Sequence, residues 1–200
     1  MRIEKMEIKI YNYEDLLKEE NENLKEKILN NFREENHDYY FLASDILEFY
    51  TGELENLGYN NTKIYYSGFW SQGDGACFIC DSIDIEKIID RMNLKVRLNL
   101  KNYLIDNFGA LLQHRGLYYH YNSVNLNYSS YFRGAGEKTE NYLNNLVEEI
   151  TDFIEDERKN YCYKIYNSLK QQYEECQSDE YILESIYVNG YEFTEDGAII

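Results

Sequence analysis

Residues 63–81 read KIYYSGFWSQGDGACFICD, and this stretch carries the strongest structural signal in the chain. Two apolar, aromatic-rich runs flank the polar residues 71–75, a pattern typical of a β-hairpin with a loop of about five residues. The stretch also holds the single Trp of the chain and two of its four Cys. We therefore expect antiparallel strands at Lys63–Trp70 and Ala76–Ile83.

Hydrophobic spacing predicts the elements before and after this hairpin. Apolar residues three and four positions apart indicate amphipathic helices, and alternating apolar residues indicate strands. Helices are expected at residues 13–36, 37–57, 180–188 and 84–108, the last as one helix or as two with a break near Asn93. Strands are expected within Met1–Tyr11, at Leu117–Tyr128 and at Tyr191–Phe193.

Two segments are open to alternative interpretations. Leu111–Tyr131 fits one long bent strand, or a short strand, a turn at Arg115–Gly116 and a long strand. Glu137–Gln177 fits a helix of about 40 residues, which would span roughly 60 Å. Either this helix breaks at residues 156–160, where charges crowd together, or its end projects and packs on a partner.

These elements indicate an α+β fold, with an antiparallel sheet of about four strands packed by helices and one long C-terminal helix. A chain of 200 residues fits a single domain. Within residues 1–200 we distinguish residues 1–58 (N-terminal strand and helix pair), 59–133 (central hairpin, helices and Tyr/His strand) and 134–200 (long helix and C-terminal tail).

The net charge of −17 limits the classes of partner. Phosphate groups repel such a surface, so we expect no direct binding of nucleic acid, whereas basic protein surfaces are attracted. Rows of carboxylates on the helices within residues 14–35 and 137–157 could imitate phosphate spacing. The chain has no signal peptide and no apolar run near 18 residues, so we expect a cytoplasmic protein without membrane contact.

The cysteines do not follow the pattern of a metal site. Cys77 and Cys80 form a C-x-x-C, but on a strand their sulfurs would point to opposite faces. A zinc knuckle also needs a second close pair, which is missing. We therefore expect buried free thiols, no metal and no cofactor.

The hairpin loop has two interpretations. Gly73 and Gly75 would allow a ligand to approach closely, with Asp74 accepting from a ribose hydroxyl, a base edge or a cation. Alternatively, glycine provides positive φ in a tight turn, and Asp74 caps the backbone. The neighbouring Ser71 lacks the G-x-S-x-G context of a catalytic nucleophile.

His120 and Arg115 are the other candidates for chemistry. His120 could act as a general base if a carboxylate orients it, or it belongs to an aromatic surface patch with Tyr119. Arg115 could hold an anionic ligand or pair with a surface carboxylate. We hypothesise one exposed patch at the end of the hairpin. The candidate binding residues are Trp70, Ser71, Gln72, Asp74, Arg115, Tyr119 and His120.

Residues 67–78, SGFWSQGDGACF, resemble the signature of a group of small phage- and prophage-encoded proteins of uncharacterised function. In that group a Tyr-His pair and a terminal Tyr-Glu-Phe-Thr-Glu-Asp-Gly run follow, as Tyr119-His120 and residues 191–197 do here. The resemblance implies a phage or mobile-element origin and no particular chemistry.

Together these features lead us to expect a non-enzymatic, acidic phage-borne protein that binds and inhibits a host protein. The leading partner class is a nucleic-acid-binding defence effector such as a CRISPR nuclease, which would make the protein an anti-CRISPR or other anti-defence inhibitor. The first alternative is a module for a nucleotide-type ligand, or a weak hydrolase, that uses the loop Gln72–Asp74 and His120. The second is an assembly protein that forms a homodimer through the long helix.

Overall fold

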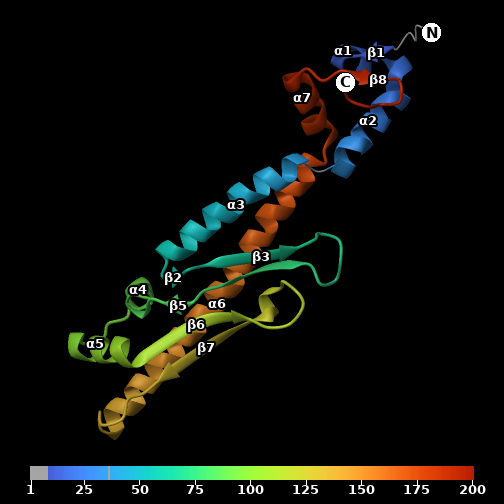
Figure 1. Ribbon diagram of the computed structural model, residues 1–200. Coiled ribbons are helices and arrows are strands. Elements are labelled where there is room, and N and C mark those ends of the chain that lie inside the picture. The colour runs from blue at the N-terminus through green and yellow to red at the C-terminus, as the bar shows by residue number, and fades with distance from the viewer. Residues whose placement is uncertain (1–8, 36) are drawn as a thin grey trace, which may run out of the picture. The chain divides into compact units, whose positions relative to one another are not determined.

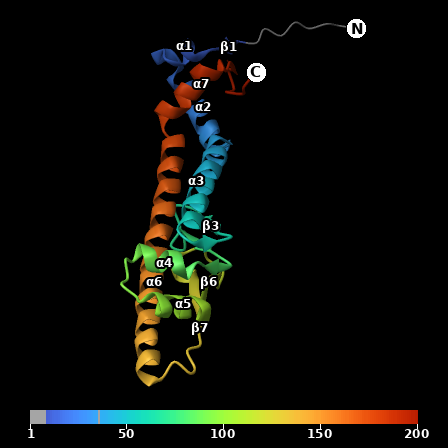
Figure 2. The same cartoon turned by 90° about the vertical axis from the view of Figure 1, so that its left-hand side faces the viewer.

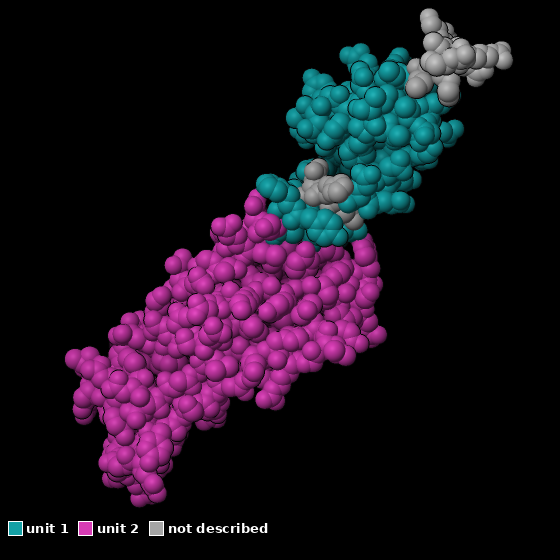
Figure 3. Space-filling view, in the orientation of Figure 1, with its two compact units in different colours: residues 1–43, 171–200 teal, residues 44–170 magenta. Residues whose placement is uncertain are grey.

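The computed structural model describes residues 9–35 and 37–200 (Figure 1). The chain forms two compact units, which Figure 3 colours teal and magenta. Unit 1 comprises residues 1–43 and 171–200, and unit 2 comprises residues 44–170. Helices α3 (His37–Asn56) and α6 (Glu137–Cys176) contribute residues to both units. The prediction that the whole chain is one domain stays a prediction.

Unit 1 is built from short elements around a small apolar core. Its elements are β1 (Ile10–Tyr11), α1 (Tyr13–Leu16), a 3-10 helix (Glu19–Asn21), α2 (Glu22–Glu35), α7 (Asp179–Asn189) and β8 (Phe193–Thr194), with the adjoining ends of α3 and α6. β1 and β8 pair antiparallel, so the beginning and the end of the described chain meet. The core contains Leu16, Ile28, Leu29, Ile182, Ile186 and Phe193.

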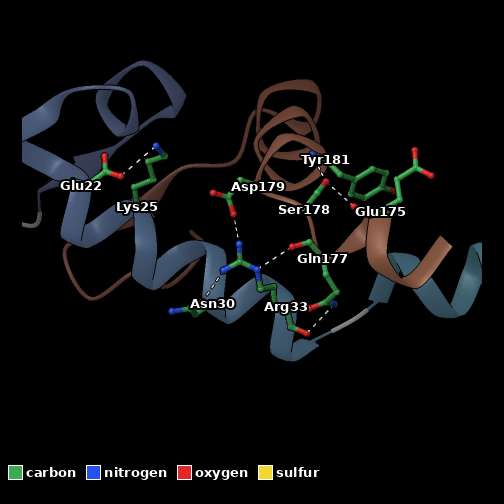
Figure 4. Close-up of polar contacts among 9 residues, drawn as sticks. All are labelled: Glu22, Lys25, Asn30, Arg33, Glu175, Gln177, Ser178, Asp179 and Tyr181. Atoms are coloured by element: carbon green, nitrogen blue, oxygen red, sulfur yellow. Dashed lines mark hydrogen bonds and ion pairs between the residues drawn. The ribbon is translucent and has the colours of Figure 1, made fainter. Parts of the chain in front are cut away.

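Arg33 joins α2 to the segment between α6 and α7 (Figure 4). Its Nε donates to the Gln177 carbonyl at 3.0 Å, and its Nη2 pairs with the Asp179 carboxylate. Its Nη1 donates to Asn30 Oδ1 at 2.8 Å. In return, the Gln177 side-chain amide donates to the Arg33 carbonyl at 3.4 Å. One guanidinium therefore connects two segments that lie far apart in the sequence.

Unit 2 combines antiparallel strand pairs with helices. Its elements are β2 (Tyr59–Asn60), β3 (Lys63–Ser67), β4 (Gly75–Ile79), β5 (Ser82–Ile83), α4 (Ile85–Arg91), α5 (Leu98–Asn107), β6 (Phe108–His114), a 3-10 helix (Tyr121–Ser123) and β7 (Val124–Ser130), with parts of α3 and α6. β3 pairs with β4, β6 with β7, and β2 with β5. An isolated bridge between Cys80 and Leu112 links the hairpin to β6.

Helix α6 provides the surface on which these strands pack (Figures 1 and 2). Within unit 2, one stripe of α6 is buried: Leu143, Leu146, Val147, Ile150, Ile154, Tyr161, Cys162, Ile165 and Leu169. From Gly75 to Phe78, β4 is buried as well. Each apolar side chain buried in this way stabilises the fold by about 1.5–3 kcal/mol before conformational entropy is subtracted.

The α+β class, the antiparallel pairing and the long C-terminal helix are confirmed, and the strands form small two-stranded sheets. The central hairpin is confirmed, although β3 ends at Ser67 and β4 ends at Ile79. The helix Glu137–Cys176 is continuous through residues 156–160. Charges do not break it there because they pair along the helix, as Arg158 does with Glu155 and Lys159 with Asp156.

Several predicted boundaries are wrong. In place of one helix over residues 13–36, residues 13–35 form α1, a 3-10 turn and α2; a capping box at Asn12 and Asp15 starts α1, which ends after one turn. Residues 84–108 form two helices with Asn93 at φ 53° between them, but Phe108 already begins β6. The predicted strand Leu117–Tyr128 is strand only from Val124 onward. The predicted strand within Met1–Tyr11 lies outside the described residues except at its end, where β1 forms.

All four cysteines are free and buried, as predicted. Burial raises the pKa of Cys77 to about 12, and the nearby Cys162 thiol adds to this shift. Burial also raises the pKa of Cys80 and of Cys162 to about 11. None of the helices in the described part of the chain combines the length and the apolar character that a membrane crossing needs.

Iodoacetamide at pH 8 should modify these cysteines far more slowly in the folded protein than in denaturing urea. A pKa of about 11 in place of 9.0 lowers the thiolate fraction at this pH about 100-fold, and burial restricts access further. Mass spectrometry of time points measures the rate. Rapid modification of Cys77 or Cys162 in the folded protein would contradict the buried positions.

Replacing Arg33 with Ala should lower the free energy of unfolding by about 1–2 kcal/mol, because the Gln177 carbonyl and Asp179 lose their donors. Lys25→Ala is the matched control. Among the described residues, Lys25 pairs with Glu22 of the same helix, at 3.5 Å, and this pair within one helix should contribute less than about 0.5 kcal/mol. Urea denaturation followed by circular dichroism measures both variants, and equal losses would argue against a special role for Arg33.

Candidate functional site

The hairpin loop between β3 and β4 is organised by Asp74. Its Oδ2 accepts hydrogen bonds from the backbone N–H of Trp70, at 2.6 Å, and of Ser71. The Asp74 N–H donates to the Ser71 carbonyl at 3.1 Å, which closes a turn. Gly68 has φ +29°, and a Cβ there would lie 2.8 Å from Asp74 Oδ1. Asp74 thus caps the loop, as the second interpretation of this sequence proposed.

A second loop, residues 115–123, connects β6 to β7 and is closed by hydrogen bonds of its own. The Arg115 N–H donates to the Ser123 carbonyl at 2.6 Å, and the Ser123 N–H donates to the His120 carbonyl at 2.8 Å. The Asn122 N–H donates to Nδ1 of His120 at 3.2 Å. This bond assigns the proton of the neutral imidazole to Nε2.

The two loops touch each other at two glycines. A Cβ on Gly75 would lie 3.0 Å from the Tyr119 carbonyl oxygen and 3.2 Å from His120 Cα, so a larger residue would require this backbone to shift. A Cβ on Gly73 would lie 2.9 Å from the ring of Tyr118. The loops therefore form one continuous surface, although they lie far apart in the sequence.

A hollow of about 480 Å³ opens where the loops meet. It is lined by Gln72, Gly73, Tyr118, His120, Asn122 and Ser123. The lining offers carboxamide, hydroxyl and imidazole groups beside one aromatic ring, and none of its side chains carries a carboxylate. It is suited to hydrogen bonding with a small uncharged group.

Large apolar side chains are exposed on the same two loops. Trp70 is 76% exposed, Leu117 91% and Tyr118 65%. Tyr119 is 36% exposed, and its ring stacks on Tyr65 with centroids 5.3 Å apart and an interplanar angle of 15°. We call Trp70, Leu117, Tyr118 and Tyr119 the apolar tip. Such gathered apolar exposure marks interaction sites in soluble proteins.

Both loops are anchored on α6. Phe69 packs against Tyr166, with ring centroids 5.7 Å apart, and Tyr121 packs against Tyr163 at 5.1 Å. Burial and, secondarily, the charge of Asp74 raise the pKa of Tyr166, and a hydrogen bond with Tyr121 raises the pKa of Tyr163. These contacts hold the apolar tip on a regular helix.

The anchoring extends to Arg158, which is only 4% exposed. Its guanidinium donates to the Tyr121 carbonyl and pairs with Glu155 one turn earlier in α6. A buried charge without such partners would cost several kcal/mol.

The two loops and the segments next to them contain few acidic residues. Residues 107–136 contain no Asp and no Glu, although the whole chain has 37 acidic residues. In residues 57–80 the one acidic residue is Asp74, whose carboxylate is engaged within its loop. The two loops that carry the apolar tip therefore come from carboxylate-poor segments of an acidic protein.

The structure brings some predicted site residues together and separates others. Gln72 and His120 line the hollow, whereas Asp74 is turned into its own loop. Ser71 is exposed in the loop and donates its N–H to Asp74. The backbone of Arg115 closes the second loop, and its side chain is exposed.

Four contributors were missed by the sequence analysis: Leu117, Tyr118, Asn122 and Ser123. Alternation is a signal that could have found two of them: it groups Tyr118 and Asn122 with His120, and all three line the hollow, although this segment is not a strand. Leu117 has no such signal, since a single exposed leucine is ordinary in a surface loop.

The geometry does not form a general base. Nδ1 of His120 accepts from a backbone N–H, and the described residues show no carboxylate bonded to this imidazole. Across residues 9–35 and 37–200, no group of three or more His, Cys, Asp or Glu could hold a metal ion.

Gly75→Ala should lower the free energy of unfolding by about 1–3 kcal/mol, because the added Cβ meets the backbone of Tyr119 and His120. Gly52→Ala is the matched control: Gly52 lies in α3 with no atom within 4 Å of an added Cβ, so this change should raise stability by up to about 1 kcal/mol. Denaturant unfolding measures both. Wild-type stability of Gly75→Ala would show that the loops do not hold each other.

A comparison with protein families finds one match for this chain. The family described as a domain of unknown function, DUF8835, matches residues 43–179, which include both loops and the whole of α6. No curated protein and no solved structure matches the chain. Because the match covers more than half of the sequence, the chain belongs to the DUF8835 family.

Proposed function

We propose that this protein is a non-enzymatic binding protein that docks on another protein through the apolar tip. The observation that carries the proposal is the exposure of Trp70, Leu117 and Tyr118 on two loops in direct contact. Trp and Tyr are enriched among the residues that dominate binding energy at protein interfaces. An exposed cluster of this kind gains most when a partner removes it from water.

The contacts that hold the loops of the apolar tip in place support this proposal. Asp74 organises the first loop, and Arg158 and Tyr163 hold the second loop on α6. A surface that is ordered before binding loses less conformational entropy when the complex forms. The tip therefore has the properties of a preorganised docking surface.

The amino-acid composition of residues 117–131 also supports docking on a protein. Tyr, Asn and Ser occupy 11 of the 15 positions in residues 117–131. Antibody binding loops are rich in the same residues, because Tyr supplies rigid amphipathic area and Ser and Asn supply adaptable hydrogen bonds. The absence of carboxylates across residues 107–136 avoids burying unpaired charge at an interface.

The proposed partner is a host protein, and docking of the apolar tip would inhibit it. The resemblance of residues 67–78 to phage and prophage proteins supports this origin, and the protein would then act in the cytoplasm of the host cell. The partner class that fits best is a nucleic-acid-binding defence effector such as a CRISPR nuclease, since the net charge of −17 favours approach to a basic surface.

The hollow favours a second candidate function, a module for a nucleotide-type ligand. A base could stack on Tyr118, while Gln72 and Asn122 hydrogen-bond its edge and Nε2–H of His120 donates to it. This candidate uses the same face as the first one. The two differ in the residues on which binding depends.

Affinity capture from a host lysate, followed by affinity measurement with the captured protein, should separate the candidates. If a protein docks on the tip, Trp70→Ala and Tyr118→Ala should each weaken binding about 30-fold, or about 2 kcal/mol. Tyr142→Ala, at an exposed position of α6 outside the tip, is the control and should bind as wild type does.

Native mass spectrometry of the purified protein provides the other readout. A retained nucleotide that is lost in Gln72→Ala and His120→Ala but kept in Trp70→Ala would favour the second candidate. If a captured protein binds Trp70→Ala and Tyr118→Ala as tightly as wild type, docking through the tip is wrong.

A further inference from the structure

Unit 1 contains a groove of about 430 Å³ that is separate from the apolar tip. It lies between α3 and α7 and is lined by Phe41 and Leu42 of α3 and by Tyr181, Glu184, Ser185 and Val188 of α7. Phe41 and Val188 are each 71% exposed. Two apolar side chains on facing helices thus remain in contact with solvent.

Helix α7 has two faces with different roles. Ile182 and Ile186 are buried in the core of unit 1. Residues 181, 184, 185 and 188 follow helical spacing on another face and line the groove. The first face packs α7 into the core of unit 1, and the second face lines the groove.

The charge around the groove is strongly one-sided. Residues 171–200 contain no Lys, Arg or His and eight acidic residues: Glu174, Glu175, Asp179, Glu180, Glu184, Glu192, Glu195 and Asp196. Asp179 pairs with Arg33. Glu180 and Glu184 are exposed, and neither forms an ion pair within the described part of the chain.

We propose that this groove binds a basic amphipathic helix of a partner protein. The apolar stripe of such a helix fits between Phe41 and Val188, and its Lys and Arg side chains reach the carboxylates of Glu180 and Glu184. A second copy of this chain is disfavoured as the occupant, because it would bring the same net charge of −17. The groove adds a binding activity on unit 1 that does not depend on the apolar tip.

The probe is a fluorescent synthetic helix of about 14 Leu and Lys residues with Leu at helical spacing. Its control peptides are a scrambled sequence of the same composition and a version with Glu in place of Lys. Fluorescence anisotropy with the full-length protein should show binding of the amphipathic basic peptide. The affinity should fall as salt rises, because exposed charges are screened beyond about 10 Å at 0.1 M salt.

Two variants test the apolar and the charged part of the groove. Phe41→Ala and Glu184→Lys should each weaken peptide binding about tenfold or more. Their matched controls are Phe49→Ala, at another exposed phenylalanine of α3, and Glu195→Lys, at an acidic residue of unit 1 outside the groove. Both controls, and Trp70→Ala in the apolar tip, should stay within about twofold of wild type.

Three results would overturn the proposal. The first is that Glu195→Lys weakens peptide binding as much as Glu184→Lys does, which would mean that the general acidity of the chain attracts the peptide. The second is equal binding of the scrambled peptide, and the third is no binding of the amphipathic peptide at low salt. All five substituted side chains are exposed, and circular dichroism of each variant checks that the helices are retained.

Discussion

The position of the loops in unit 2 depends on the contacts of one buried guanidinium group. Arg158 lies on α6 at 4% exposure, and a charge in that position requires partners. It finds them in Glu155 and in the carbonyl of Tyr121, so the loop that follows β6 is tied to the long helix. The contact of Gly75 with that loop then positions the hairpin. Together these contacts hold the two loops that form the apolar tip.

Carboxylates are distributed unevenly along the chain, and the two proposed binding surfaces differ accordingly. The tip lies where residues 107–136 have no Asp or Glu, while the groove lies where residues 171–200 have no basic residue. A neutral aromatic surface gains affinity from desolvation, and an acidic groove gains it from charge pairing and faster encounter. One acidic protein thus offers two surfaces with different dependence on salt.

Errors in the sequence-based elements have identifiable causes. Phe108–His114 contains an apolar run that fits a helix as well as a strand, and pairing with β7 decides between them. The aromatic segment Leu117–His120 has high strand propensity but no strand to pair with, so it remains a loop. In the candidate site, Gln72 and His120 line one hollow, whereas Asp74, which the sequence also offered as a ligand-binding group, caps its own turn.

The sequence by itself determined the α+β class, the central hairpin and the buried thiols, and it offered backbone capping by Asp74 as one of two interpretations. These features depend on periodicity and on hydrogen bonds between residues a few positions apart, which a single sequence displays directly. Only the tertiary structure decided that the hairpin loop meets residues 115–123, that Arg158 is buried and that α7 leaves one face to a groove. These outcomes depend on which distant segments pack together. That choice follows from burial and charge pairing summed over many contacts, none of which leaves a local pattern in the sequence.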